Sequence, residues 1–300
     1  MAVETQQRGA VGQSVRKVDG PSLVAGKPLF TLDLDIPGSL VGAILPSPHA
    51  HARIVSVDTS EAEQVPGVRA ILHHGNVPRV PYTTAGQGWP EPSPYDTVLF
   101  DTKVRFVGDR VAAVAAETED AAAEALAKIR VEYELLPPVL SSEEALAAGA
   151  PIIHDEPDAE GIYDAAHNIA AAVDIPIGDV AAALAAAPVT AEATCEIPYS
   201  QHATIEPHCV IAYFDDAGRL ILRTSTQVPF HVRRIVARVV GLDPARIRVV
   251  KPRIGGGFGS KQEVLLEPVA ALLARRTGRP VRMTYTRQEV FVASRTRHPM

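Results

Sequence analysis

The sequence predicts an α+β protein, and three local patterns support that fold class. Arg105–Ala116 alternates like a strand, and a helix is predicted from Glu119 to about Ile129. Val210–Phe214 and Arg219–Thr224 form a second pattern, a strand pair around a typical turn sequence. The third pattern is an apolar helix at Glu267–Thr277. Strands that alternate with packed helices in this way are typical of the α+β class.

The first half of the chain is predicted to contain short strands punctuated by proline and glycine. Thr118 is placed to cap the helix that follows it, which carries acidic residues in its first turn and Lys128 near its end. The other elements expected here are strands within 25–57, at 68–72 and at 131–133, helical turns at 59–64 and 143–148, and a long loop at 75–100.

The second half alternates in a similar way and has clear helix boundaries. Pro229 and Gly241 bracket a predicted helix at 230–240, and Gly278 follows the helix that begins near Glu267. An alanine-rich helix is expected at 179–187, and strands are expected at 191–199, 246–251 and 281–286. These elements divide the chain into a leader at 1–18, a first domain at 19–140, a linker at 141–170 and a second domain at 171–300.

Composition excludes several functional classes. The net charge of −6 argues against nucleic acid as the main partner. No apolar run approaches the roughly 20 residues that a membrane span needs, and the polar N-terminus lacks the apolar core of an export signal. Cys195 and Cys209 form no C-x-x-C motif, so no cysteine-held zinc or iron–sulfur centre is encoded. A reducing cytoplasm is therefore the expected compartment.

A glycine-rich stretch, Arg253–Glu263, is the clearest candidate for chemistry. It follows a predicted strand, precedes a predicted helix and contains four glycines around one phenylalanine. Such a segment exposes backbone N–H groups and lets a ligand approach the main chain closely. It matches neither the Walker pattern, which requires Gly-Lys-Ser/Thr, nor the dinucleotide pattern Gly-x-Gly-x-x-Gly. The remaining structural alternative is a tight turn that only joins two elements.

Four motifs in a fixed order resemble the molybdenum-binding large subunit of the xanthine dehydrogenase and aldehyde oxidase family. They are Ser47-Pro48-His49-Ala50-His51-Ala52-Arg53-Ile54, Val107-Gly108-Asp109-Arg110-Val111-Ala112-Ala113-Val114, Ser225-Thr226-Gln227-Val228-Pro229 and the segment from Arg253 to Gln262. The resemblance covers the chain from about Arg16. It implies an α/β hammerhead domain up to about residue 140, followed by the beginning of a molybdopterin-binding domain.

The resemblance also implies a cofactor and partners. The expected cofactor is molybdenum–molybdopterin in its cytosine dinucleotide form, with [2Fe-2S] clusters and FAD on partner subunits. The implied reaction hydroxylates a purine, N-heterocycle or aldehyde, with water as the oxygen source. The family's catalytic glutamate, which serves as the base, is expected beyond the chain end. The 300 residues are therefore expected to be a fragment or a split subunit, inactive without the C-terminal part.

The resemblance assigns roles residue by residue. Gln227 matches the glutamine whose amide hydrogen-bonds a terminal ligand of the metal, and an amide can donate to an oxo group without adding charge. Phe258 matches a residue that packs beside the substrate near the metal, with a core aromatic as its structural alternative. Gly259 is expected to offer its backbone N–H to the cofactor, and Gly256 and Gly257 to bring the main chain near it.

Gln262 is the informative departure from the family pattern. Purine-oxidising animal enzymes carry a glutamate at this substrate-binding position, whereas this chain has a neutral amide. Xanthine is therefore one candidate among several heterocycles. Lys261 is expected to be a solvated or phosphate-facing charge rather than a catalyst. Two alternatives stay open, an aldehyde oxidase or carbon monoxide dehydrogenase large subunit and a non-catalytic assembly module of the same fold.

The histidines give weaker signals. His49 and His51 would share one face of a strand, but two ligands do not make a metal site, so structural roles are favoured. His202, Glu206 and His208 could pass for a His/carboxylate cluster. The resemblance instead implies a buried supporting segment near the cofactor.

Overall fold

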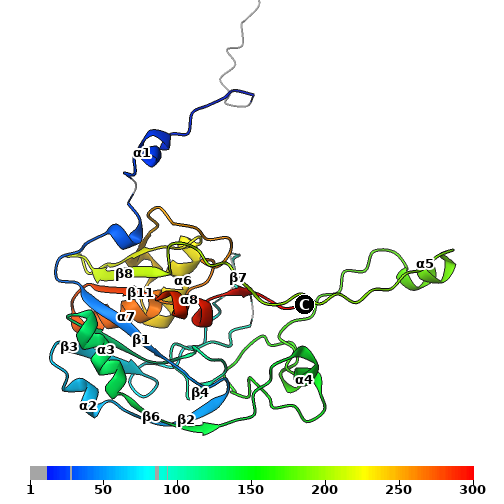
Figure 1. Cartoon of the computed structure of the whole chain (residues 1–300), viewed down its shortest axis with the longest axis horizontal. Coiled ribbons are helices and arrows are strands. Elements are labelled where there is room, and N and C mark those ends of the chain that lie inside the picture. Colours follow the sequence, from blue (N-terminus) through cyan, green and yellow to red (C-terminus); the bar gives the residue numbers. More distant parts are fainter. Residues whose placement is uncertain (1–11, 28, 85–87, 93) are drawn as a thin grey trace, which may run out of the picture.

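The computed structural model describes residues 12–27, 29–84, 88–92 and 94–300. Residues 1–11 of the predicted leader, and residues 85–87 and 93 of the predicted long loop, lie outside the described residues. The central feature of the described part is a seven-stranded mixed sheet with the order β10-β9-β8-β11-β1-β5-β3, whose strands come from both halves of the chain (Figure 1).

The elements have the following bounds. The helices are α1 Gly20–Val24, α2 Ser60–Glu63, α3 Glu119–Lys128, α4 Ser142–Leu146, α5 Val180–Ala186, α6 Pro229–Val240, α7 Glu267–Thr277 and α8 Arg287–Ala293, with 3-10 turns at Thr31–Asp33, Ala165–His167 and Pro244–Arg246. The strands are β1 Leu40–Pro46, β2 Ala52–Asp58, β3 Val68–His73, β4 Lys103–Val104, β5 Arg110–Ala116, β6 Arg130–Leu135, β7 Ser200–Gln201, β8 Cys209–Phe214, β9 Leu220–Thr224, β10 Ile247–Val250, β11 Val281–Thr284 and β12 Thr296–Arg297.

One sheet crosses the predicted domain boundary. Strand β1 pairs in parallel with β11, with Leu40 opposite Val281, so the N-terminal and C-terminal halves share main-chain hydrogen bonds. On the far side of β1, strand β5 pairs with it in antiparallel fashion. A smaller three-stranded sheet, β4-β2-β6, completes the N-terminal half. The boundaries at 140 and 171 stay predictions, while the sheet makes one body of both halves.

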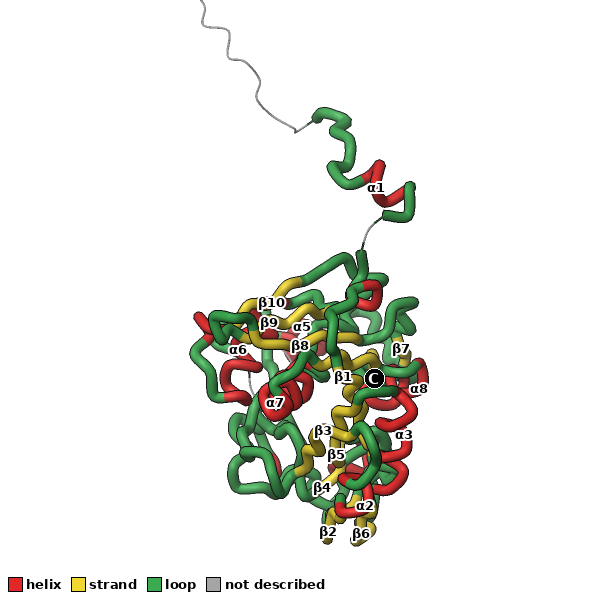
Figure 2. Tube along the Cα trace, turned by 90° about the vertical axis from the view of Figure 1, so that its left-hand side faces the viewer, coloured by secondary structure: helices red, strands yellow, loops and turns green. Residues whose placement is uncertain are grey.

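Helices cover both faces of the sheet, and the strand sequences explain why. Leu40 and Ile44 of β1 pack in the core that contains α7, whereas Val41 and Ala43 pack against the core that contains α3. Strand β5 is buried on both faces by the same alternation, and its alanines let the two layers approach closely. Figure 2 shows α7 and α3 on opposite sides of the strands.

The predicted helix boundaries are confirmed by the capping geometry. The Thr118 side chain accepts a hydrogen bond from the Ala121 N–H at the start of α3. Gly241 and Gly278 take left-handed conformations after α6 and α7, as the positions of those glycines predict. The strand predicted at Ala191–Tyr199 is wrong for this structure, because residues 191–199 are extended, exposed and outside any strand.

The segment predicted as a linker is tied to the body by ion pairs. Glu156 lies 2.7 Å from Arg105, and Asp158 lies 2.7 Å from Arg79. Asp155 also pairs with the buried Lys103. The stretch therefore follows the surface of the N-terminal half instead of spanning free space. Among the described residues, no helix is both long and apolar enough to cross a bilayer.

Candidate active site

Gln227 and the glycine loop, defined here as Gly255–Gly259, meet because of the sheet topology. Strands β9 and β10 are parallel neighbours, so their carboxyl ends reach the same edge of the sheet. Gln227 lies three residues beyond the end of β9, and the loop follows the end of β10. Loops at the carboxyl ends of adjacent parallel strands are brought together in space. The topology thus joins two motifs that are about 30 residues apart in sequence.

Direct contacts hold Gln227 against the loop. Its side-chain Oε1 accepts the Gly259 N–H at 3.1 Å, and its backbone N–H donates to the Lys261 carbonyl at 2.8 Å. A Cβ at Gly257 would lie 2.5 Å from Gln227 Oε1, so any side chain at this position would have to displace the Gln227 amide. Since Oε1 is engaged, the Nε2 group is the free end of the amide, with no acceptor among the described residues.

The loop presents three consecutive backbone N–H groups. Within the described part of the chain, the N–H groups of Gly256, Gly257 and Phe258 donate to no acceptor. Gly256 has a φ of +103° and Phe258 a φ of +52°, so the main chain takes positive-φ conformations at two of these three positions. The expectation that Gly259 offers its N–H to a cofactor is corrected, because that group donates to Gln227.

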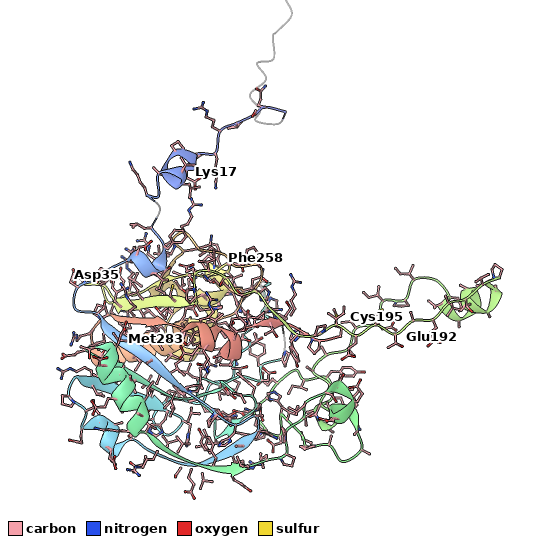
Figure 3. All side chains as sticks on the ribbon, in the orientation of Figure 1. Lys17, Asp35, Glu192, Cys195, Phe258 and Met283 are labelled. Atoms are coloured by element: carbon pink, nitrogen blue, oxygen red, sulfur yellow. The ribbon has the colours of Figure 1, made fainter. Side chains whose placement is uncertain are left out.

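Phe258 points away from the protein core. Its side chain is 72% exposed, and Figure 3 labels it at the surface of the body. Among the described residues, Phe258 is therefore not part of a hydrophobic core. A left-handed non-glycine residue is uncommon and costs on the order of 1 kcal/mol, so the surrounding contacts must hold it there.

A buried ion pair supports the loop from below. Lys261 Nζ lies 2.8 Å from Glu206 Oε2, with side-chain exposures of 0% and 5%. The same carboxylate oxygen accepts the Gly255 N–H at 2.8 Å. The prediction that Lys261 is a solvated or phosphate-facing charge is wrong, since its ammonium group is enclosed with a carboxylate partner. The pair fixes the first residue of the loop through Glu206.

His208 forms a second support under the loop. Its Nε2–H donates to the Ser260 carbonyl at 3.0 Å, and its Nδ1 is buried without a partner among the described residues. Burial lowers the pKa of His208 from 6.5 to about 4. The same burial raises the pKa of the neighbouring Cys209 thiol to about 12, so this cysteine stays protonated and unreactive at neutral pH.

The His208 geometry predicts acid sensitivity. Because the pKa of His208 is lower in the folded state, the unfolded chain takes up the proton first as the pH falls. The stability that the neutral His208 contributes is therefore complete above pH 6.5 and declines toward pH 4. We expect the free energy of unfolding to fall by up to about 3 kcal/mol across that window. Urea unfolding of wild type and His208→Gln at pH 7.5, 5.5 and 4.5 checks this.

His298→Gln, at an exposed histidine, is the matched control and should retain the wild-type pH dependence. A His208→Gln variant with an unchanged pH slope would contradict the assignment.

Gln262 and Glu263 lie at the end of the loop in different surroundings. The Gln262 N–H donates to the Gly259 carbonyl at 3.3 Å, which keeps this amide beside the loop. Glu263 lines a separate cavity of about 650 Å³, together with Arg110 and Tyr285. Burial raises the pKa of Glu263, and its nearest cationic partner is Arg295 at 3.8 Å.

Two further sequence expectations need correction or restatement. The start of α7 does not serve the glycine loop, because Glu267 fills it and accepts the Leu265 N–H at 3.1 Å. His51 is buried and its Nδ1 contacts the Pro137 carbonyl at 2.8 Å, while His49 packs edge-on against Tyr133. No group of three or more His, Cys, Asp or Glu side chains in the described ranges is placed to hold a metal ion.

The supporting residues were only partly visible in the sequence. Thr204, Glu206 and His208 are buried, while Ala203 before them and Ile205 among them are exposed. This segment therefore inverts the usual pattern, with polar side chains inward and apolar ones outward. The alternation of polar residues at 204, 206 and 208 is the signal that could have marked them. The partner of Glu206, Lys261, lies 55 positions away in the sequence.

Two family models account for most of the chain. Residues 25–137 match the aldehyde oxidase and xanthine dehydrogenase a/b hammerhead domain, and residues 162–300 match the molybdopterin cofactor-binding domain. The two matches occur in the order that the four motifs predict. This chain belongs to the molybdenum hydroxylase large-subunit family.

Individual members of the molybdenum hydroxylase family support the same placement. The probable hypoxanthine oxidase XdhD of Escherichia coli K12 is 42% identical over 96% of this chain and 33% of its own length. The xanthine dehydrogenase molybdenum-binding subunit of Escherichia coli O157:H7 is 34% identical over 94% of this chain and 37% of its own length. The chain thus spans about a third of the length of these curated relatives.

Solved structures of the family share the fold. Quinoline 2-oxidoreductase from Pseudomonas putida 86 superposes with a TM-score of 0.81 and 31% identity, over 96% of this chain and 36% of that one. The reconstituted CO dehydrogenase of Oligotropha carboxidovorans also has a TM-score of 0.81, with 29% identity, over 95% of this chain and 36% of that one. The predicted α+β class, with a hammerhead domain followed by a molybdopterin-binding domain, is confirmed.

The geometry fits the molybdenum–molybdopterin group that the cofactor-binding domain implies. The free Nε2 of Gln227 and the three free N–H groups of the loop are neutral donors, suited to oxygen or other electron-rich atoms. At Gly257 the backbone approaches so closely that any Cβ would meet the Gln227 side chain. Among the described residues, these four groups are therefore hydrogen-bond donors without an acceptor.

Proposed function

We propose that this chain is the N-terminal portion of the molybdenum-binding subunit of a xanthine dehydrogenase-type hydroxylase. The proposed enzyme hydroxylates a purine, N-heterocycle or aldehyde, with water as the oxygen source. The observation that carries the proposal is the contact between Gln227 and the glycine loop, which leaves an amide NH₂ and three N–H groups without acceptors among the described residues.

The proposed roles follow from these contacts. When bound, the molybdenum–molybdopterin group supplies two-electron oxidation of an electron-poor carbon. Gln227 donates from Nε2 toward this group and anchors Gly259 through Oε1. Gly256, Gly257 and Phe258 donate from the backbone, and the exposed Phe258 ring offers an apolar face against which a planar substrate can stack. We assign these residues to cofactor binding, with Gln227 and Phe258 nearest the metal.

Gln262 is proposed to contact the substrate. It lies one turn beyond the Gly257–Gly259 segment and can both donate and accept hydrogen bonds. The names of similar proteins refer to hypoxanthine, xanthine, nicotinate, quinoline and aldehydes. A neutral amide suits an uncharged heterocycle. A preference for an N-heterocycle over an aldehyde is therefore part of the proposal.

We further propose the cytosine dinucleotide form of the cofactor, and partner subunits that carry [2Fe-2S] clusters and FAD. Several similar proteins are named as subunits of larger enzymes, including the nicotinate dehydrogenase large molybdopterin subunit of Eubacterium barkeri. Two free cysteines and no disulfide among the described residues are compatible with assembly in a reducing cytoplasm. Turnover is expected only from the assembly, because the catalytic base is expected outside these 300 residues.

The test is cofactor content in the assembled enzyme. We expect stoichiometric molybdenum and a pterin in the purified assembly. In Gly257→Ala the molybdenum content should fall by about tenfold or more, because the added methyl displaces Gln227. Gly20→Ala is the matched control, since a Cβ at Gly20 meets only an ordinary 3.7 Å contact. A folded assembly without molybdenum would overturn the proposal.

A further inference from the structure

Residues 170–200 form an arm that leaves the body of the protein. All of them are exposed, and the short helix α5 lies at the tip (Figure 1). Figure 3 places Glu192 and Cys195 on the returning limb, far from the sheet. Exposed apolar side chains are spread along the arm, among them Val173, Ile175 and Val189. Folded chains rarely leave so many apolar groups in water unless another surface covers them.

The returning limb, residues 189–199, has the sequence of a strand without forming one. Its odd positions carry Val, Ala, Ala, Cys, Ile and Tyr, and its even positions carry Thr, Glu, Thr, Glu and Pro. Strict alternation of this kind predicts a strand with one buried face. Because backbone hydrogen bonds in a strand must come from a neighbour, the pattern indicates that the limb's neighbour is missing from this structure.

The beginning of that neighbour is already present. Thr296 pairs with Gln201 and Arg297 with Ser200 in the β12–β7 ladder. Further out, Ile197 and Met300 exchange both backbone hydrogen bonds, at 2.7 and 3.1 Å, in the same register. If the antiparallel ladder continued, the position after Met300 would face Glu196, and the eighth position would face Val189.

Proline placement agrees with this register. Since Ile197 N–H points toward the Met300 strand, the N–H groups at odd positions of the limb point the same way and those at even positions point outward. Both prolines of the limb region, Pro188 and Pro198, occupy even positions. Pro299 lies opposite Pro198 in the same register. Each proline thus lacks only an N–H that the ladder does not use.

We propose that the returning limb is the docking strand for the polypeptide that follows the matched region in the longer relatives. The chain spans only 33% of the length of the E. coli XdhD relative, so most of such a partner lies outside these residues. The first eight residues of that polypeptide would extend the β12 ladder along 196–189, and the rest of it would cover the apolar side chains at the odd positions. The inference rests on the ladder and not on the proposed reaction.

Two neighbouring proline substitutions test the register. Ala193→Pro removes an N–H that points into the predicted ladder, whereas Thr194→Pro removes one that points away from it. Both positions are exposed and make no backbone hydrogen bond in this structure, so both variants should fold like wild type. The chain is co-expressed with the region of E. coli XdhD that follows its matched segment, and co-purification and residue-resolved hydrogen exchange are measured.

The expected result is co-purification of the wild-type pair, with exchange at odd positions of 189–197 slowed by about tenfold or more relative to the chain alone. Ala193→Pro should reduce recovery of the pair by about tenfold, and Thr194→Pro should not. The proposal would be overturned if the wild-type pair failed to form or if the two variants behaved alike. It would also be overturned if the chain alone showed the same protection at high concentration, because a second copy would then be the occupant. None of these measurements uses turnover or metal content.

Discussion

Replacing Lys261 with methionine is expected to lower the free energy of unfolding by about 3–5 kcal/mol. Methionine fills a similar volume but leaves the Glu206 carboxylate, which is 5% exposed, without its counter-ion. The same carboxylate oxygen holds the Gly255 N–H, so the first residue of the glycine loop should also lose its order. Urea unfolding at pH 7.5 measures the first effect, and hydrogen exchange at Gly255 measures the second.

Two controls separate charge from packing in this experiment. Lys128→Met removes one partner of an exposed pair, Lys128–Glu124, and should change stability by less than about 1 kcal/mol. The double variant Lys261→Met/Glu206→Gln replaces the buried ion pair with neutral side chains and should recover much of the loss. If Lys261→Met and Lys128→Met behaved alike, the buried pair would not support the loop.

Replacing Gln227 with alanine is expected to lower turnover of the assembled enzyme by about a hundredfold or more. The substitution removes the Oε1 that accepts the Gly259 N–H at 3.1 Å, and it also removes the Nε2 donor that we propose for the cofactor. Steady-state rates with a heterocycle and with an aldehyde, normalised to molybdenum content, provide the measurement.

Gln227→Glu separates the two functions of that amide. A carboxylate oxygen can still accept the Gly259 N–H, but the variant has no NH₂ to donate. Low turnover in both variants, with normal stability of Gln227→Glu, supports a direct role for the Nε2 donor. Low turnover in Gln227→Ala alone would reduce Gln227 to a positioning residue, and unchanged turnover in both would favour the non-catalytic assembly module.

The sheet that joins the two halves has a consequence for engineering this protein. Because β1 pairs directly with β11 and contributes Leu40 and Ile44 to the core beside α7, the hammerhead half cannot be removed without exposing that core. The two regions matched by the family models, 25–137 and 162–300, therefore share one sheet and one core.

Local physics in the sequence determined the helices, their ends and the position of the glycine loop. Thr118, Gly241 and Gly278 act through nearest-neighbour backbone geometry, so their roles can be predicted without knowing the rest of the fold. The four motifs, taken together and in order, also indicated the family from sequence alone, because each of them is short and contiguous.

Tertiary structure alone decided the surroundings of Lys261 and the state of the limb at 189–199. A lysine in a glycine-rich stretch is usually solvated, and its burial here depends on Glu206, which is brought beneath it from 55 positions away. The limb has the alternating pattern of a strand, but a strand also needs a neighbour to receive its hydrogen bonds. Within the described ranges, Met300 is the one residue that exchanges backbone hydrogen bonds with it. Local sequence encodes a preference, whereas long-range contacts determine whether that preference is satisfied.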